Sequence, residues 1–294
     1  MGGGSWTSSS YVSHSTKSRG FSDMASFKSA SAQELYRSKN LDASLNPYKV
    51  VRECCDSEEH PETIPVILAL DVTGSMGAAA EAVAKQLNDI MDNLYGEVKD
   101  VEFAIMAIGD FSYDHAPLQV SQFESDIRIA EALEKVYFER GGGGNSWESY
   151  TAAWYFGLNN TKLDCWNRGR KGIIITLGDE PLNPYLPKDV VRRVIGNSVQ
   201  GDVETNDLFS EVKEKFDIYH IAINDPETAY RHYATKIDNT FGRLLGDNFK
   251  VSTCNNLACT ISDIIKNSSN KDESLVNTTK TEETYKYSEN GISW

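Results

Sequence analysis

Four short segments that are apolar at nearly every residue constrain this chain more than any other feature. They are residues 64–70 (IPVILAL), 101–108 (VEFAIMAI), 172–177 (GIIITL) and 218–223 (IYHIAI). A continuous apolar run of this length predicts a strand that is buried on both faces of a sheet. The segment after the first run has apolar residues at helical spacing, at positions 76, 80, 83, 87, 90 and 94. The chain therefore alternates buried strands with amphipathic helices.

This alternation predicts a doubly wound α/β domain, with a mainly parallel sheet, right-handed crossovers and helices on both faces. We expect six strands in the order 3-2-1-4-5-6, including an antiparallel edge strand at 118–123 and a last strand near 249–251. Helices are predicted over 127–138, 147–158, 187–194, 208–216, 226–236 and 257–266. Ligands bind such sheets beyond the carboxyl ends of the strands, so we look for chemistry in the loops after residues 70, 108 and 177.

The two ends of the chain differ in composition from the middle. Residues 1–31 contain eleven serines and four glycines, which predicts a flexible arm. Residues 32–62 are expected to form a partly docked extension, residues 63–267 the α/β domain, and residues 268–294 a polar tail. The amino terminus has no apolar segment typical of a secretory signal.

The charge and cysteine content exclude several classes of partner. With 29 basic and 43 acidic residues the net charge is −14, which opposes binding to nucleic acid and to anionic membranes. The longest apolar run, seven residues at 64–70, is far shorter than a membrane-spanning helix requires. Five cysteines, an odd number, fit a reducing compartment, so we expect a cytoplasmic protein. From the charge and the short apolar run we expect neither nucleic acid nor a membrane as partner.

Oxygen-bearing side chains gather directly after the predicted strands. Asp71, Thr73 and Ser75 follow the first strand, and Gly178 and Asp179 follow the third. Further polar residues lie after the second strand and after a run of four glycines, namely Asp110, Asn145, Ser146 and Glu148. Carboxylate and hydroxyl oxygens suit a hard cation, so Mg²⁺ is predicted, with Mn²⁺ or Ca²⁺ as alternatives.

The Asp-x-Thr-x-Ser pattern at positions 71, 73 and 75 resembles the Asp-x-Ser-x-Ser signature of the von Willebrand factor A domain. That family has a Rossmann-like fold and a metal-ion-dependent adhesion site, and the resemblance covers residues 64–266. It implies that Asp71, Thr73 and Ser75 bind the metal and that Asp179 completes the site. The family's second loop supplies a Thr, whose place here falls at Asn145 or Ser146. Residues implied to lie beside the ligands are Asp110, Ser146 and Glu148.

The resemblance implies a protein-binding module and no enzyme. In the family, an Asp or Glu of a partner protein binds the cation, so we expect a scaffold or adaptor, with an AAA+ ATPase as one candidate partner. A structural component of a bacterial or phage particle is the alternative. A third interpretation is an Asp-nucleophile phosphoryl transferase similar to the haloacid dehalogenases. In that case Val72 and Thr73 replace the Lys and the second Asp of such enzymes. Without any metal, the same pattern fits an ordinary helix N-cap.

Overall fold

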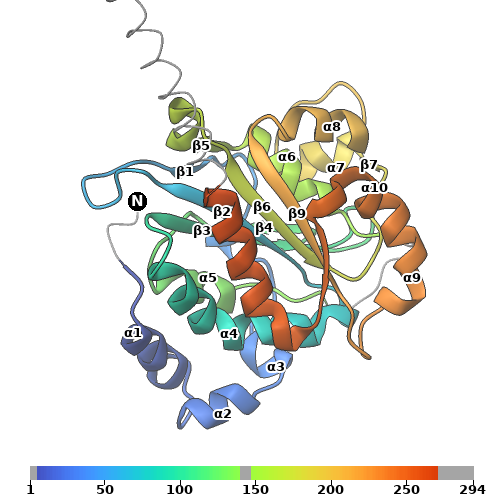
Figure 1. Cartoon of the computed structure of the whole chain (residues 1–294). Coiled ribbons are helices and arrows are strands. Elements are labelled where there is room, and N and C mark those ends of the chain that lie inside the picture. Colours follow the sequence, from blue (N-terminus) through green and yellow to red (C-terminus); the bar gives the residue numbers. More distant parts are fainter. Residues whose placement is uncertain (1–4, 140–146, 271–294) are drawn as a thin grey trace, which may run out of the picture.

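The computed structural model describes residues 5–139 and 147–270 of the chain. A six-stranded sheet passes through the middle of the molecule (Figure 1). Its strands are β2 (Ile64–Asp71), β3 (Val101–Ile108), β4 (Leu118–Val120), β6 (Gly172–Gly178), β9 (Phe216–Ile223) and β10 (Phe249–Ser252).

The order across the sheet is β10-β9-β6-β2-β3-β4. Every neighbouring pair is parallel except β3 with the edge strand β4. Counted over these six strands alone, in chain order from the β4 edge, the order is 3-2-1-4-5-6. Four further strands, which the sequence did not predict, lie outside this sheet: β1 (Arg52–Cys54) pairs with β5 (Thr161–Leu163), and β7 (Tyr185–Leu186) pairs with β8 (Val203–Glu204).

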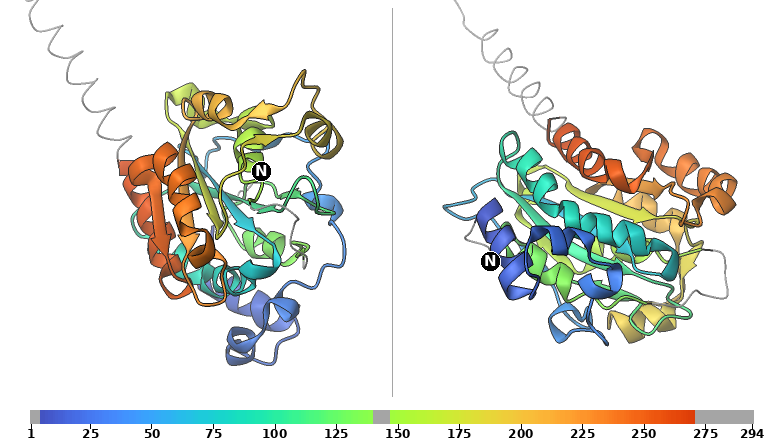
Figure 2. Two further views of the ribbon diagram at one scale, coloured as in Figure 1. Left: turned by 90° about the vertical axis from the view of Figure 1, so that its right-hand side faces the viewer. Right: turned by 90° about the horizontal axis from the view of Figure 1, so that it is seen from below.

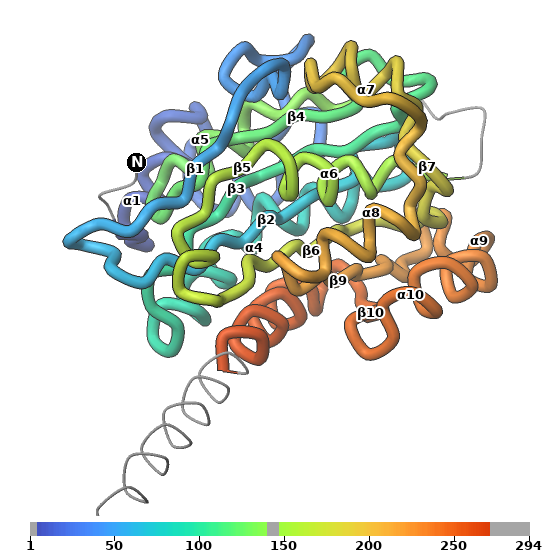
Figure 3. The backbone as a smooth tube through the Cα atoms, turned by 90° about the horizontal axis from the view of Figure 1, so that it is seen from above, coloured from blue at the N-terminus to red at the C-terminus, as the bar shows by residue number. Residues whose placement is uncertain are grey.

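Helices cover both faces of the sheet (Figures 2 and 3), which confirms the predicted α/β architecture. One face packs against α4 (Gly77–Tyr95), α5 (Arg128–Glu134) and a helix at 257–270. The other face packs against α6 (Thr151–Asn159), α7 (Lys188–Val194) and α8 (Thr205–Val212). In β2, Val66, Leu68 and Leu70 face the first layer, and Ile67 and Ala69 face the second. This two-residue period explains why the strand is apolar throughout.

The remaining elements are short. Beyond β9 the chain forms α9 (Tyr230–Ile237), a π-helical turn η5 (Asp238–Gly242), α10 (Arg243–Leu245) and the 3-10 turn η6 (Gly246–Asn248). Other 3-10 turns are η2 (Ala43–Leu45), η3 (Gly74–Met76), η4 (Asp164–Arg168) and η7 (Cys254–Asn256). None of the helices within residues 5–139 and 147–270 combines the length and apolar composition needed to cross a bilayer.

Several predicted helices differ from the observed ones at their ends. The helix expected at 208–216 is α8, Thr205–Val212, because Phe216 already belongs to β9. The helix expected at 226–236 is α9, Tyr230–Ile237. The helix expected at 127–138 is only α5, Arg128–Glu134, and the one expected at 147–158 begins at Thr151. In both cases the apolar spacing continues past the helix because Phe138 and Trp147 lie in neighbouring non-helical segments. Helical periodicity alone therefore extended the prediction too far.

The amino-terminal segment is ordered, contrary to the prediction of a flexible arm. Residues 5–31 contain α1 (Ser8–Ser13), a π-helical turn η1 (His14–Ser18) and α2 (Met24–Ser29), and α3 (Ala32–Leu35) follows. They lie along α4 and α5 (Figure 2). Trp6, Tyr11 and Phe27 are buried in the same core cluster as α4. A few large aromatic residues thus order a segment whose average composition is that of a linker.

Candidate functional site

The carboxyl ends of three central strands bring the predicted acidic residues to one edge of the sheet. Leu70 pairs with Leu177, so Asp71 is level with Gly178, one residue before Asp179. Asp71 also pairs with Ile108, two residues before Asp110. A bridge between Glu148 and Leu182 brings the loop before α6 to the segment that follows β6. We call this set the acidic edge: Asp71, Asp110, Glu148, Asp179 and Glu180.

Asp71 is fully buried, and both of its carboxyl oxygens accept hydrogen bonds. Oδ1 accepts from the backbone N of Thr73 at 2.9 Å and from Thr73 Oγ1 at 2.6 Å, which closes the turn between β2 and η3. Oδ2 accepts from Tyr150 Oη at 2.8 Å. Because the Thr73 hydroxyl donates its hydrogen to Asp71, the lone pairs of Thr73 Oγ1 remain able to bind a cation.

Tyr150 holds Asp71 from the opposite side, and sequence reasoning missed it. Its ring is fully buried, with centroids 5.1 Å from His220 and 5.4 Å from Phe241 in edge-on arrangements. A Cβ at Gly178 would lie 1.8 Å from Tyr150 Oη, so only glycine leaves room for the hydroxyl. The one signal in the sequence is this glycine at the end of a buried strand, directly before Asp179.

Asp179 lies across from Asp71 and keeps one oxygen unpaired. Oδ2 accepts a hydrogen bond from the backbone N of Ala229 at 2.6 Å, whereas Oδ1 is buried without a hydrogen-bond partner. Burial raises the pKa of Asp179, and the nearby Ser75 hydroxyl partly offsets this. The third residue of the predicted ligand pattern is thus close to Asp179.

Two more carboxyl groups at this edge have an unpaired, buried oxygen. Glu148 Oε2 and Asp110 Oδ2 have no hydrogen-bond partner, and both residues are at most 2% exposed. Asp110 Oδ1 accepts from the backbone N of Ser112 at 2.6 Å. The backbone N of Asp110 donates to Asp114 Oδ2 at 2.7 Å, which brings in a carboxyl group that the sequence did not single out. Asn145 and Ser146, the predicted second-loop residues, lie outside the described residues.

Burial, together with the charge of neighbouring carboxyl groups, raises the pKa values of Asp71, Glu148 and Glu180. For Asp71 burial is the main cause, and the charge of Asp179 adds to it. For Glu148 burial is again first, followed by the charges of Asp71 and Glu180. Burial and then the charge of Asp179 raise the pKa of Glu180 to about 7, and burial raises that of Asp114 to about 6. These groups hold protons close to neutral pH unless a cation neutralises them.

The residues fit a hard cation bound by a mixture of carboxylate and hydroxyl oxygens. Buried oxygens without partners on Asp179, Asp110 and Glu148 are the acceptors that a cation would satisfy. In the part of the chain that the structure describes, no set of three or more His, Cys, Asp and Glu side chains is arranged to hold a metal by itself. Hydroxyl groups and water would therefore have to supply the remaining ligands, as the Thr73 and Ser75 positions allow.

Comparisons with known proteins show the fold and do not identify a family. No known protein-family profile matches the sequence, and no curated protein matches it. Among solved structures, the chain is similar to the pilus adhesin SpaC from Lactobacillus rhamnosus GG in its open conformation, with a TM-score of 0.50 and 12% identity. That match covers 75% of this chain and 31% of the adhesin.

A second SpaC structure and the proximal thread matrix protein 1 from the mussel byssus give weaker matches. Their TM-scores are 0.44 and 0.42, with 13% and 16% identity. The matches cover 75% and 74% of this chain, and 32% and 46% of the matched proteins. The chain thus spans less than half the length of each.

Proposed function

We propose that this chain is a metal-dependent protein-binding module of the von Willebrand factor A type. Asp71, Thr73, Ser75 and Asp179 would hold Mg²⁺ at the acidic edge. The bound cation would supply a coordination position for a carboxylate of a partner protein. The observation that carries the proposal is the buried Asp179 Oδ1, which has no hydrogen-bond partner and lies beside Asp71 and Ser75.

The geometry around Asp71 favours binding over the phosphoryl-transfer alternative. A nucleophilic Asp needs a carboxyl oxygen that a phosphoryl group can approach, and a buried oxygen is less accessible to that group than to a single small cation. In this structure both oxygens of Asp71 accept hydrogen bonds, from Thr73 and Tyr150, and the residue is fully buried. An Asp that is held in this way is suited to orient ligands around a cation.

Glu148 offers a further oxygen ligand in the loop before α6, where the von Willebrand factor A family has a Thr ligand. Its Oε2 is buried and unpaired, and after burial the charge of Asp71 is the largest cause of its raised pKa. We therefore include Glu148 with Asn145 among the candidates for the second-loop ligand. A carboxylate in this position would strengthen cation binding, because it adds negative charge to the site.

The partner is defined by its chemistry, an exposed Asp or Glu side chain. The net charge of −14 repels an acidic partner at long range, so recognition depends on direct bonding to the cation. Copurification distinguishes an AAA+ ATPase partner from a particle, because the two give assemblies of different mass.

Calorimetric titration with MgCl₂ tests the proposal. Wild-type protein should bind Mg²⁺, and Asp71→Ala should weaken that binding by at least about 100-fold while the circular dichroism spectrum is unchanged. The matched control is Asp189→Ala, because the Asp189 side chain is 79% exposed on α7. Equal Mg²⁺ affinity in wild type and Asp71→Ala would exclude this metal site.

A further inference from the structure

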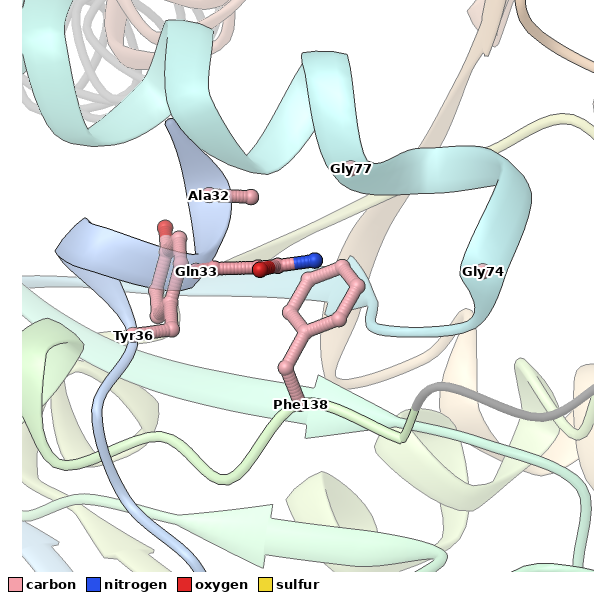
Figure 4. Close-up of a pocket in the computed structure, with 6 residues that line it drawn as sticks. All are labelled: Ala32, Gln33, Tyr36, Gly74, Gly77 and Phe138. Carbon is pink, nitrogen blue, oxygen red and sulfur yellow. The ribbon is translucent and has the colours of Figure 1, made fainter. Parts of the chain in front are cut away.

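A cavity of about 250 Å³ lies between the amino-terminal segment and the turn after β2 that contains Thr73, Gly74 and Ser75. It is lined by Ala32, Gln33, Tyr36, Gly74, Gly77 and Phe138, shown in Figure 4. We call it the α3 cavity, since three of these residues belong to α3 or follow it directly. It exists because residues 5–36 fold against α4, which the sequence did not predict.

The α3 cavity shares a wall with the candidate metal site. Gly74 stands between Thr73 and Ser75, two of the proposed ligands, and Gly77 begins α4. A Cβ at Gly77 would be 3.9 Å from the Cβ of Ala32, so α3 packs directly on this first turn of the helix. A partner residue that binds the cation therefore has its neighbours in the chain within reach of the cavity.

The walls of the α3 cavity are apolar, with one amide group. Tyr36 donates its hydroxyl hydrogen to Ala80 O at 2.7 Å, so its polar end is used elsewhere. Its ring lies 5.6 Å from that of Phe138, at 38°. Gln33 is exposed, and its side chain extends across the cavity toward Phe138 (Figure 4). The amide can both donate to and accept from a peptide backbone.

The volume limits what the cavity can hold. One water molecule takes about 30 Å³ in the liquid, so the space corresponds to roughly eight such volumes. This fits the four heavy atoms of a Leu, Ile or Met side chain together with part of a backbone.

We propose that the α3 cavity is a specificity subsite for a partner segment in which an aliphatic side chain stands one or two residues from the metal-binding acid. The Leu, Ile or Met side chain packs against the contacting rings of Tyr36 and Phe138, and the Gln33 amide hydrogen-bonds the adjacent peptide group. This inference rests on the proposed function, because the acid must first bind the cation.

Peptide display tests the subsite without a known partner. A phage library of peptides with one fixed Glu and random neighbours is selected on the full chain in MgCl₂ and eluted with EDTA. We expect Leu, Ile or Met to be enriched at a position next to the Glu. A synthetic peptide of the enriched sequence is then titrated against wild type, Ala32→Leu, Gln33→Ala and the control Tyr48→Ala, an exposed aromatic residue outside the cavity.

Ala32→Leu fills the cavity and should weaken peptide binding by about tenfold or more, while the Mg²⁺ affinity stays at the wild-type value. Gln33→Ala should weaken it by about threefold to tenfold, and Tyr48→Ala should change nothing. Three results would overturn the subsite and leave the metal site standing. The selected peptides could bind in Mg²⁺ without an aliphatic residue next to the Glu, or no peptide could be enriched although the protein binds Mg²⁺. The third is that Ala32→Leu binds the peptide with wild-type affinity. Absence of Mg²⁺ binding to wild type instead refutes the proposed function, and the subsite with it.

Discussion

Replacing Tyr150 with Phe removes one hydroxyl group from the interior and tests whether that group positions Asp71. The hydroxyl donates to Asp71 Oδ2 at 2.8 Å. With a cation bound, Asp71 is charged, and a hydrogen bond to a charged group contributes about 1.5–3 kcal/mol. The same hydrogen bond contributes about 1 kcal/mol before the cation binds, so Mg²⁺ binding loses the difference, about 0.5–2 kcal/mol. Since 1.4 kcal/mol corresponds to a factor of ten, the Mg²⁺ dissociation constant should rise about 2- to 30-fold.

The effect on folding is measured separately, in the metal-free protein. In the metal-free protein the pKa of Asp71 is raised by burial and by Asp179, so its carboxyl group is largely neutral. A hydrogen bond between neutral groups contributes about 1 kcal/mol. We therefore expect Tyr150→Phe to lower the free energy of unfolding in EDTA by about 1 kcal/mol, measured by urea denaturation.

The matched control is Tyr155→Phe on α6, the helix whose N-cap residue is Tyr150. Its hydroxyl accepts a hydrogen bond from Asn197 Nδ2 at 3.3 Å, away from the acidic edge. Calorimetric titration with MgCl₂ compares the two variants with wild type. If Tyr150→Phe and Tyr155→Phe have the same dissociation constant for Mg²⁺, Tyr150 has no role in positioning a metal ligand.

Three further predictions concern the acidic edge and the amino-terminal segment. Because folding raises the pKa values of Asp71 and Glu180, the latter to about 7, the folded state binds more protons than the unfolded chain. The metal-free protein should therefore lose stability as the pH rises from about 4 to about 7 and above. Thermal melts in EDTA should show a lower midpoint at about pH 8 than at about pH 5. In separate melts without EDTA, added Mg²⁺ should raise the midpoint mainly at the higher pH. A midpoint in EDTA that does not change with pH would contradict the raised pKa values of Asp71 and Glu180. Gly178→Ala places a methyl group 1.8 Å from Tyr150 Oη, so it should weaken Mg²⁺ binding at least as much as Tyr150→Phe, measured in the same titration. Phe27→Ala should cost about 3–5 kcal/mol in urea denaturation, since Phe27 is 1% exposed, whereas a detached arm would show no change.

Much of the fold could be predicted from the sequence because its signals are local. A strand buried on both faces must be apolar at every position, as in β2 and β6, and a helix that covers such a sheet must repeat its apolar residues at helical spacing, as in α4. The same logic placed Asp71 and Asp179 at one edge, because parallel strands end on the same side. The sequence likewise shows oxygen-bearing side chains directly after β2, β3 and β6, at Asp71, Asp110 and Asp179.

The tertiary structure decided the contacts between residues that are far apart in the chain. The Tyr150 hydroxyl reaches Asp71 across 79 positions, and Ala32 meets Gly77 across 45. No periodicity encodes either contact, since each depends on how helices and strands pack in three dimensions. The average composition of residues 1–31 also concealed that Trp6, Tyr11 and Phe27 bury themselves against α4. The burial of a few large side chains can offset the entropy of ordering a serine-rich segment, but only where a complementary apolar surface is already formed.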